Sequence, residues 1–124
     1  MKQKTISSSH LLAETAVKAL QEKKGLNIVT MDLEGIDGAI CNFFVVCSGT
    51  SDKHVQALSS SVEDIVREEL SDKPINTEGY RVGEWVLMDY VDVVVHIFQR
   101  DKREFFDIED LWGDAKFERY EDLV

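Results

Sequence analysis

A small-residue turn is the first place in this 124-residue chain where chemistry could occur. The segment Ser48-Gly-Thr-Ser51 follows an apolar run and precedes a helix-like stripe, a position where free backbone N–H groups can hold a phosphate. The segment lacks the Lys-Ser/Thr pair of a P-loop and any Gly-x-Gly-x-x-Gly fingerprint, so a tight turn with a helix N-cap is favoured. The alternative that stays open is a small nucleotide-binding, nucleotidyltransferase-type enzyme using Ser48 to Ser51.

The acidic residues do not have the spacing of a metal-dependent active site. In nucleotidyltransferases a similar turn is followed by a strand-borne Asp-x-Asp or Asp-x-Glu pair. Here Glu63 and Asp64 are adjacent on a predicted helix and point about 100° apart. Asp89 and Asp92 flank a tight corner with two residues between them. The pattern resembles a nucleotidyltransferase-like fold without the catalytic acids.

The histidines and cysteines predict core positions and no metal site. His96 lies mid-strand on the face of Val94 and Phe98, where a buried, hydrogen-bonded histidine is the favoured interpretation. Cys41 and Cys47 are separated by roughly 20 Å along a strand, too far for a disulfide, so we expect reduced core thiols. No His/Cys/Asp cluster has zinc spacing, and we predict no metal, no cofactor and no catalytic residue.

The composition predicts one acidic globular domain. The chain has 14 Lys and Arg against 24 Asp and Glu, a net charge of −10 that disfavours RNA contact and favours a basic partner. Acidity that only maintains solubility is an equally open interpretation. The first ten residues lack the apolar core of a signal peptide, and no apolar run approaches the ~20 residues that span a bilayer. We therefore expect a cytoplasmic protein without membrane contact.

Hydrophobic periodicity predicts alternating helices and strands. Residues 10–24, 55–70 and 103–112 have helical spacing, and residues 26–33, 42–47, 84–88 and 91–98 are strand-like, with a further short strand within 75–83. The short link from Asp89 to Val91 predicts an antiparallel hairpin. This order predicts an α/β fold, a single domain over residues 1–113 with a mixed β-sheet flanked by helices. The charged tail, residues 114–124, is expected to be partly disordered.

Large aromatic residues are concentrated near the end of the chain. Because Phe105 and Phe106 are adjacent on a predicted helix, at least one of them should lie on the surface. Trp, Tyr and Arg are the residue types that concentrate at interface hot spots. We expect a mixture of core and contact residues among Trp85, Tyr90, Phe98, Phe105, Phe106 and Trp112.

In order and spacing, several segments resemble the Iojap family, the ribosomal silencing factors (RsfS). The resemblance extends from about Leu12 to Trp112. It rests on Cys47-Ser-Gly-Thr-Ser51 with His54-Val55, Glu78-Gly79, Trp85-Val-Leu-Met-Asp89, Asp92-Val-Val-Val-His96-Ile-Phe98 and Arg103-x-Phe-Phe-x-Ile-Glu-x-Leu-Trp112. Two positions depart from the family pattern. Val91 stands where many relatives carry Gly, and Met88 where an aliphatic residue is frequent.

The resemblance implies a translational repressor and not an enzyme. Such proteins bind the large ribosomal subunit through ribosomal protein uL14, block joining of the small and large subunits, and lower translation in nutrient limitation. It also implies a possible homodimer, whose interface could compete with the ribosomal partner. By resemblance, the partner-binding residues are Trp85, Leu87, Asp89, Tyr90, Asp92, Arg103 and Phe106.

Overall fold

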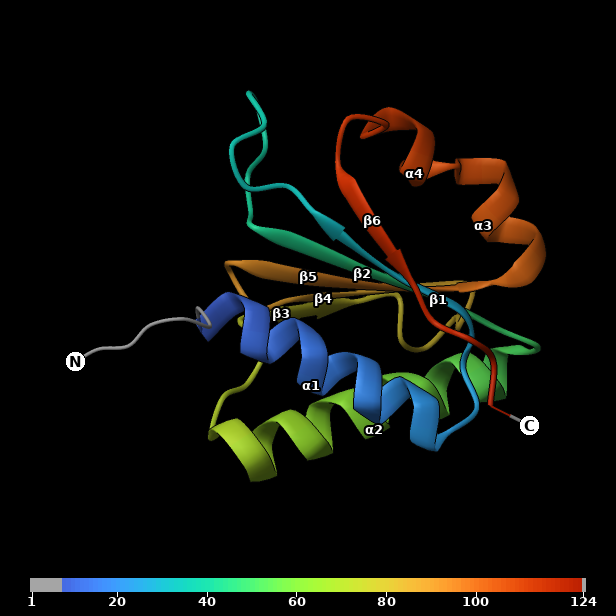
Figure 1. The fold of residues 1–124 in the computed structure, drawn as a ribbon. Helices are drawn as coiled ribbons and strands as arrows, with labels where there is room; N and C mark the ends of the chain where they lie inside the picture. Colours follow the sequence, from blue (N-terminus) through green and yellow to red (C-terminus); the bar gives the residue numbers. More distant parts are fainter. Residues whose placement is uncertain (1–7, 124) are drawn as a thin grey trace.

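A six-stranded mixed sheet organises the chain, and the computed structural model describes residues 8–123 (Figure 1). The sheet order is β3-β4-β5-β2-β1-β6, with β2 and β5 parallel and the other neighbours antiparallel. The elements are α1 (Ser8–Glu22), β1 (Leu26–Asp32), β2 (Phe43–Gly49), α2 (Asp52–Leu70), β3 (Asn76–Glu78), β4 (Trp85–Asp89), β5 (Val93–Gln99), α3 (Arg100–Phe106), α4 (Ile108–Leu111) and β6 (Lys116–Arg119). The α/β prediction with a mixed sheet is confirmed.

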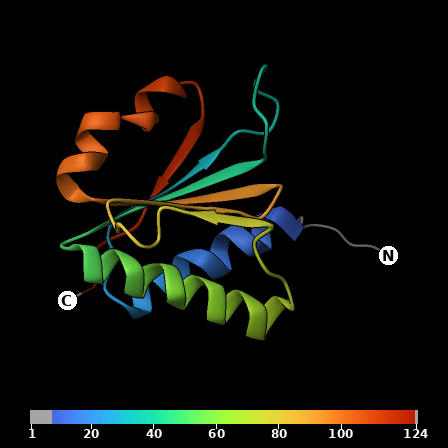
Figure 2. The ribbon, with the colours of Figure 1, turned by 180° about the vertical axis from the view of Figure 1, so that it is seen from behind.

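The two faces of the sheet are covered unequally (Figures 1 and 2). The long helices α1 and α2 lie side by side across one face and enclose the larger core cluster, which includes Leu20, Leu58 and Ile97. The short helices α3 and α4 lie on the opposite face above a smaller cluster that includes Phe44 and Phe98. Because the second layer is short, it covers only part of its face.

The central strands and α2 follow directly from their sequences. All seven residues of β2 are buried, as the continuous apolar run predicts for a strand covered on both faces. The apolar stripe of α2 places Val55, Val62 and Val66 in the core. The helix begins after Ser51, whose side-chain oxygen accepts a hydrogen bond from the His54 N–H at 3.0 Å.

The β4–β5 hairpin is confirmed as antiparallel, and its corner has an unusual backbone. Val91 has a φ of 77°, a left-handed conformation that is strained for a β-branched residue. This explains why a glycine would suit the position. The Asp89 carboxylate accepts a hydrogen bond from the Val91 N–H at 2.8 Å, and the Tyr90 N–H donates to the Val93 carbonyl at 2.8 Å. These bonds hold the tight turn.

Two sequence predictions near the C-terminus are wrong. The single helix over 103–112 is two helices, because Asp107 adopts a left-handed φ of 45° between α3 and α4. As a result Phe105 and Leu111 are 80% and 75% exposed and do not share a buried side with Ile108. The sequence predicts that the tail lies outside the domain, but its residues 116–119 form β6, which pairs antiparallel with β1 and so extends the sheet.

Candidate partner-binding surface

Strand β4 has two opposite faces with different surroundings. Val86 and Met88 are fully buried beneath α2, whereas Trp85, Leu87 and Asp89 alternate with them and point to the partly covered face. These three residues, together with Phe106 of α3, are called the open face below. They are four of the seven predicted partner-binding residues, and the structure brings them onto one side of the sheet.

Trp85 lies at the centre of an aromatic cluster. Its ring stacks on Phe98 at a centroid distance of 4.9 Å and packs at a tilt against Phe106 at 4.7 Å. Its indole Nε1–H donates a hydrogen bond to Nδ1 of His96 at 3.1 Å. Phe106 is 42% exposed and its neighbour Phe105 is 80% exposed, which confirms the prediction that at least one of the two lies on the surface. The cluster therefore forms an apolar platform that is packed below and open above.

Acidic groups border this platform toward the hairpin corner. Directly opposite Leu87 on the edge strand is Glu78, which therefore shares its face. Asp89 ends β4, and Asp92 is exposed in the corner that follows. Sequence reasoning missed Glu78 because its place depends on strand pairing, and the three residues of β3 are too few to predict a partner strand. The surface thus combines an apolar centre with carboxylates at one end.

Tyr90 does not belong to the open face. It is 6% exposed and packs in the core cluster beneath α1 and α2. Burial raises the pKa of its phenol well above the usual range, and the hydroxyl has no hydrogen-bond partner among the described residues. The assignment of the Tyr90 side chain to the contact surface is therefore wrong for this structure. The physical reason is parity, because position 90 continues the buried series of Val86 and Met88.

Arg103 of α3 bonds to residues of three other elements and is largely withdrawn from solvent. Its guanidinium makes a bidentate ion pair with Glu109 at 3.0 and 3.1 Å, and the two side chains are 11% and 21% exposed. It also donates to the Asn27 carbonyl at 2.6 Å and to Ser48 Oγ at 3.0 Å. These bonds connect α3 and α4 to the ends of β1 and β2. Because its guanidinium is engaged within the protein, Arg103 holds α3, and with it Phe106, in place and is not itself presented to a partner.

The Ser48–Ser51 turn uses its own polar groups internally. The Thr50 N–H donates to Nδ1 of His54 at 2.9 Å, and Nε2 of that ring donates to the Lys23 carbonyl at 2.8 Å. The Lys53 N–H is bound by the Asp52 carboxylate at 2.7 Å. A phosphate would have to displace these bonds and approach a carboxylate. This geometry favours the turn-and-cap interpretation over the nucleotide-binding alternative.

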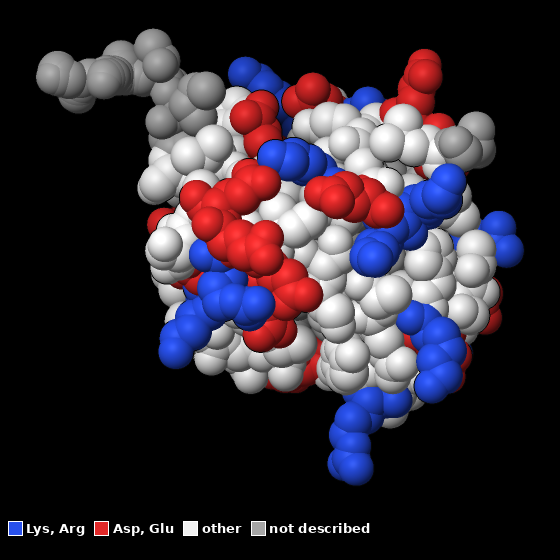
Figure 3. All heavy atoms as spheres, turned by 90° about the horizontal axis from the view of Figure 1, so that it is seen from below, with Lys and Arg blue, Asp and Glu red and all other residues white. Residues whose placement is uncertain are grey.

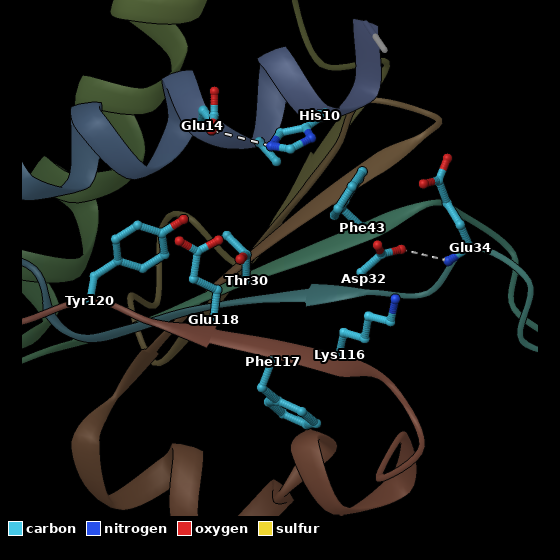
Figure 4. Close-up of a pocket in the computed structure, with 11 residues that line it drawn as sticks. His10, Glu14, Thr30, Asp32, Glu34, Phe43, Lys116, Phe117, Glu118 and Tyr120 are labelled. Carbon is cyan, nitrogen blue, oxygen red and sulfur yellow. Dashed lines mark hydrogen bonds and ion pairs between the residues drawn. The ribbon is translucent and has the colours of Figure 1, made fainter. Parts of the chain in front are cut away.

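A pocket of about 420 Å³ lies between α1 and the strands β1 and β6 (Figure 4). Its walls include Phe43 and Tyr120 with the carboxylates of Glu14, Asp32 and Glu118. Within residues 8–123, no group of three His, Cys, Asp or Glu residues is arranged to hold a metal ion. The pocket therefore lacks the ligand set of a metal centre.

The remaining predicted core residues are where the sequence placed them. Cys41 and Cys47 are free and buried, and burial raises the pKa of these thiols to about 11 and about 12. His96 is 5% exposed, and burial lowers its pKa to about 4. The prediction that this histidine is buried and hydrogen-bonded is confirmed. These groups pack in the core. Because the pKa values of the two thiols are raised, few thiolates form and the cysteines are poorly suited to nucleophilic chemistry.

The helical face carries much of the acidic charge. Figure 3 views this face, on which Asp and Glu side chains gather in a band bordered by Lys and Arg. The exposed acids of α1 and α2 are Glu14, Glu22, Asp52, Glu63, Asp64, Glu68 and Glu69. None of the helices described within residues 8–123 combines the length and apolarity needed to cross a membrane.

Comparison with known proteins identifies one family over nearly the whole chain. Residues 6–123 match the RsfS family, described as ribosomal silencing factor during starvation. The chain is 37% identical over 118 residues to ribosomal silencing factor RsfS of Halalkalibacterium halodurans, covering 94% of this chain and 98% of that protein. It is 33% identical over 73 residues to the chloroplastic protein Iojap of Zea mays, covering 59% of this chain and 31% of that protein.

A solved structure has the same fold. The crystal structure of a protein from Chromobacterium violaceum superposes with a TM-score of 0.81 at 32% sequence identity, covering 95% of this chain and 94% of the other. The agreement extends over nearly the full length of both chains.

Proposed function

Because this chain belongs to the ribosomal silencing factor family, we propose that it represses translation by binding the large ribosomal subunit through ribosomal protein uL14. Bound there, it blocks joining of the small and large subunits and lowers translation in nutrient limitation. It acts on ribosomes in the cytoplasm and needs no cofactor or metal. The proposed contact residues are Trp85, Leu87, Asp89 and Phe106 on the open face, with Asp92 at the adjoining corner.

The open face is the single observation that supports this proposal most. Trp85 and Phe106 form a contiguous apolar platform on a sheet face that α3 and α4 leave partly uncovered. Aromatic anchors in the centre of an interface supply desolvated contact area and commonly dominate the binding free energy. The packing beneath Trp85 holds the platform in place before binding, which lowers the entropic cost of association.

The charge distribution favours a basic protein within an RNA-rich surface. Asp89 lies on the open face, Glu78 and Asp92 border it, and the chain as a whole carries a net charge of −10. Carboxylates attract Lys and Arg of a partner and are repelled by neighbouring phosphates. This combination supports little direct RNA contact and selects protein uL14 over the ribosomal RNA around it.

Co-sedimentation with isolated large subunits tests the proposal. Wild-type protein should pellet with the subunits, and Trp85→Ala should weaken binding by at least about 30-fold, the effect of losing a hot-spot residue. Leu87→Lys should weaken it as well, because it places a positive charge against a basic partner. Tyr90→Phe is the matched control, since its side chain is buried on the other face and binding should be retained.

Subunit joining provides the functional readout. Addition of wild-type protein to large subunits should lower the 70S fraction formed with small subunits on a sucrose gradient, and Trp85→Ala should restore it. Retained binding and retained blocking by Trp85→Ala and Leu87→Lys, with unchanged circular dichroism, would exclude the open face as the contact surface.

A homodimer that buries the same platform would compete with the ribosomal partner. Sedimentation velocity at increasing protein concentration, with and without purified uL14, measures this competition. Added uL14 should convert any dimer into a one-to-one complex. A dimer that persists in complex with uL14 would place the two interfaces on different surfaces.

A further inference from the structure

We propose that His96 is a positioning residue that holds the indole of Trp85 in the orientation presented to the partner, an inference that rests on the proposed function of the open face. The two residues come from neighbouring strands, with Trp85 paired opposite Phe98 and Leu87 paired opposite His96. His96 therefore lies diagonal to Trp85 on the same face of the sheet.

The hydrogen bond between the two side chains has a defined direction. The indole Nε1–H of Trp85 can only donate, so Nδ1 of His96 is the acceptor at 3.1 Å. The neutral imidazole then carries its proton on Nε2. An aliphatic or phenyl side chain at position 96 would pack against the same neighbours but could not accept this bond.

The surroundings of His96 are apolar, so packing alone does not explain a histidine at this position. The ring packs edge-on against Phe44 at a centroid distance of 4.6 Å and lies parallel to Phe98 at 6.2 Å. Its Nε2 is buried without a hydrogen-bond partner among the described residues. An orphaned donor in an aromatic cluster is unfavourable for stability, and an apolar side chain would avoid it. What histidine provides, and an apolar side chain cannot, is the acceptor for the Trp85 indole N–H.

The consequence for the open face is an oriented apolar surface. The indole N–H is the only polar hydrogen of the Trp85 side chain, and it is directed inward to His96. Phe98 and Phe106 pack against the same ring at 4.9 and 4.7 Å. The partner therefore meets carbon surface with no unsatisfied donor. The chemistry that fits is an aliphatic side chain or the methylene stem of a Lys or Arg.

Restricting Trp85 before binding should improve affinity by a measurable factor. Immobilising one side chain during association weakens binding by about two- to tenfold. Loss of the His96 acceptor allows the indole to turn, so the entropic cost of immobilising it is added to the free energy of binding. His96→Leu should weaken binding of purified uL14 by about two- to tenfold. His96→Gln, which keeps an acceptor oxygen, should lose less.

The indole N–H resonances provide a readout that general destabilisation would not change. The chain has two tryptophans, so Trp112 is an internal reference in ¹H–¹⁵N spectra. In His96→Leu the Trp85 indole resonance should shift and its hydrogen exchange should accelerate. The Trp112 resonance should change less, because Trp112 reaches His96 only through Phe44. Val45→Ala, a fully buried change elsewhere in the sheet, is the stability control and should leave both the Trp85 resonance and the affinity unchanged.

A double-mutant cycle by calorimetry with uL14 tests the route of the effect. His96→Leu should reduce affinity in the wild-type background and have no further effect in the Trp85→Ala background. An equal reduction in both backgrounds, or an unshifted Trp85 resonance, overturns the positioning role. If wild-type protein does not bind uL14, the proposed function fails, and the role of His96 in binding fails with it. The resonance then decides separately whether His96 orients Trp85.

Discussion

Removing the guanidinium of Arg103 should destabilise the protein far more than removing a surface guanidinium. Arg103→Met keeps an unbranched apolar stem of similar length but deletes the group that binds Glu109, Asn27 and Ser48. Because the side chains of Arg103 and Glu109 are 11% and 21% exposed, the carboxylate left behind is only poorly solvated. Breaking a buried pair costs about 3–5 kcal/mol, and the residual exposure lowers the expected loss to about 2–4 kcal/mol.

The matched control is Arg67→Met. Arg67 pairs with Asp64 at 3.0 Å, nearly the same distance, but the two side chains are 56% and 59% exposed. Exposed pairs contribute about 0–1 kcal/mol because water and salt screen them. Urea denaturation followed by circular dichroism gives the free energy of unfolding of each variant. The comparison isolates burial, since residue type and substitution are the same.

The double variant Arg103→Met/Glu109→Leu separates loss of the pair from the orphaned carboxylate. It should recover much of the stability lost by Arg103→Met, because no unpaired charge remains in the α3–α4 layer. A loss below about 1 kcal/mol for Arg103→Met, or a loss equal to that of Arg67→Met, would refute the reasoning. Either result would mean that the layer relaxes and lets water reach Glu109.

Three further outcomes can be measured on the purified protein. Stability should fall as pH decreases from 6.5 toward about 4. In this range His96 binds a proton in the unfolded chain, but burial lowers its pKa in the folded protein and keeps it neutral. His96→Leu should flatten this slope in urea titrations. Gly83→Ala should lower the free energy of unfolding by about 1 kcal/mol or more beyond Gly38→Ala. Both have positive φ, but only at Gly83 would the added Cβ press on α2, and melting temperatures check this. Ellman's reagent at pH 8 should modify neither Cys41 nor Cys47 until denaturant is added, because burial raises both thiol pKa values; rapid reaction without denaturant would contradict that burial.

The elements with a clear period were predictable, and those set by distant contacts were not. The stripe of α2 and the apolar run of β2 are local signals that match the structure. The strand β6 is a short, charged segment whose partner β1 lies more than eighty residues earlier in the chain. The break at Asp107 also escaped prediction, because a single left-handed residue hardly alters the spacing of the apolar positions around it. Pairing and backbone breaks of this kind depend on tertiary context.

The candidate surface shows where a sequence argument needs strand parity as well as residue type. Grouping Trp85 with Tyr90 follows from their nearness and from the residue types frequent at hot spots. They are five residues apart, an odd separation, and so point to opposite faces while the strand stays regular. The structure agrees with this parity, since Tyr90 is 6% exposed under the long helices while Trp85 lies on the open face. Parity also makes Leu87 and Asp89 the natural neighbours of Trp85. A partner that docks on this strand must therefore match an apolar-to-acidic gradient along one face, which is a more specific requirement than a collection of aromatic residues.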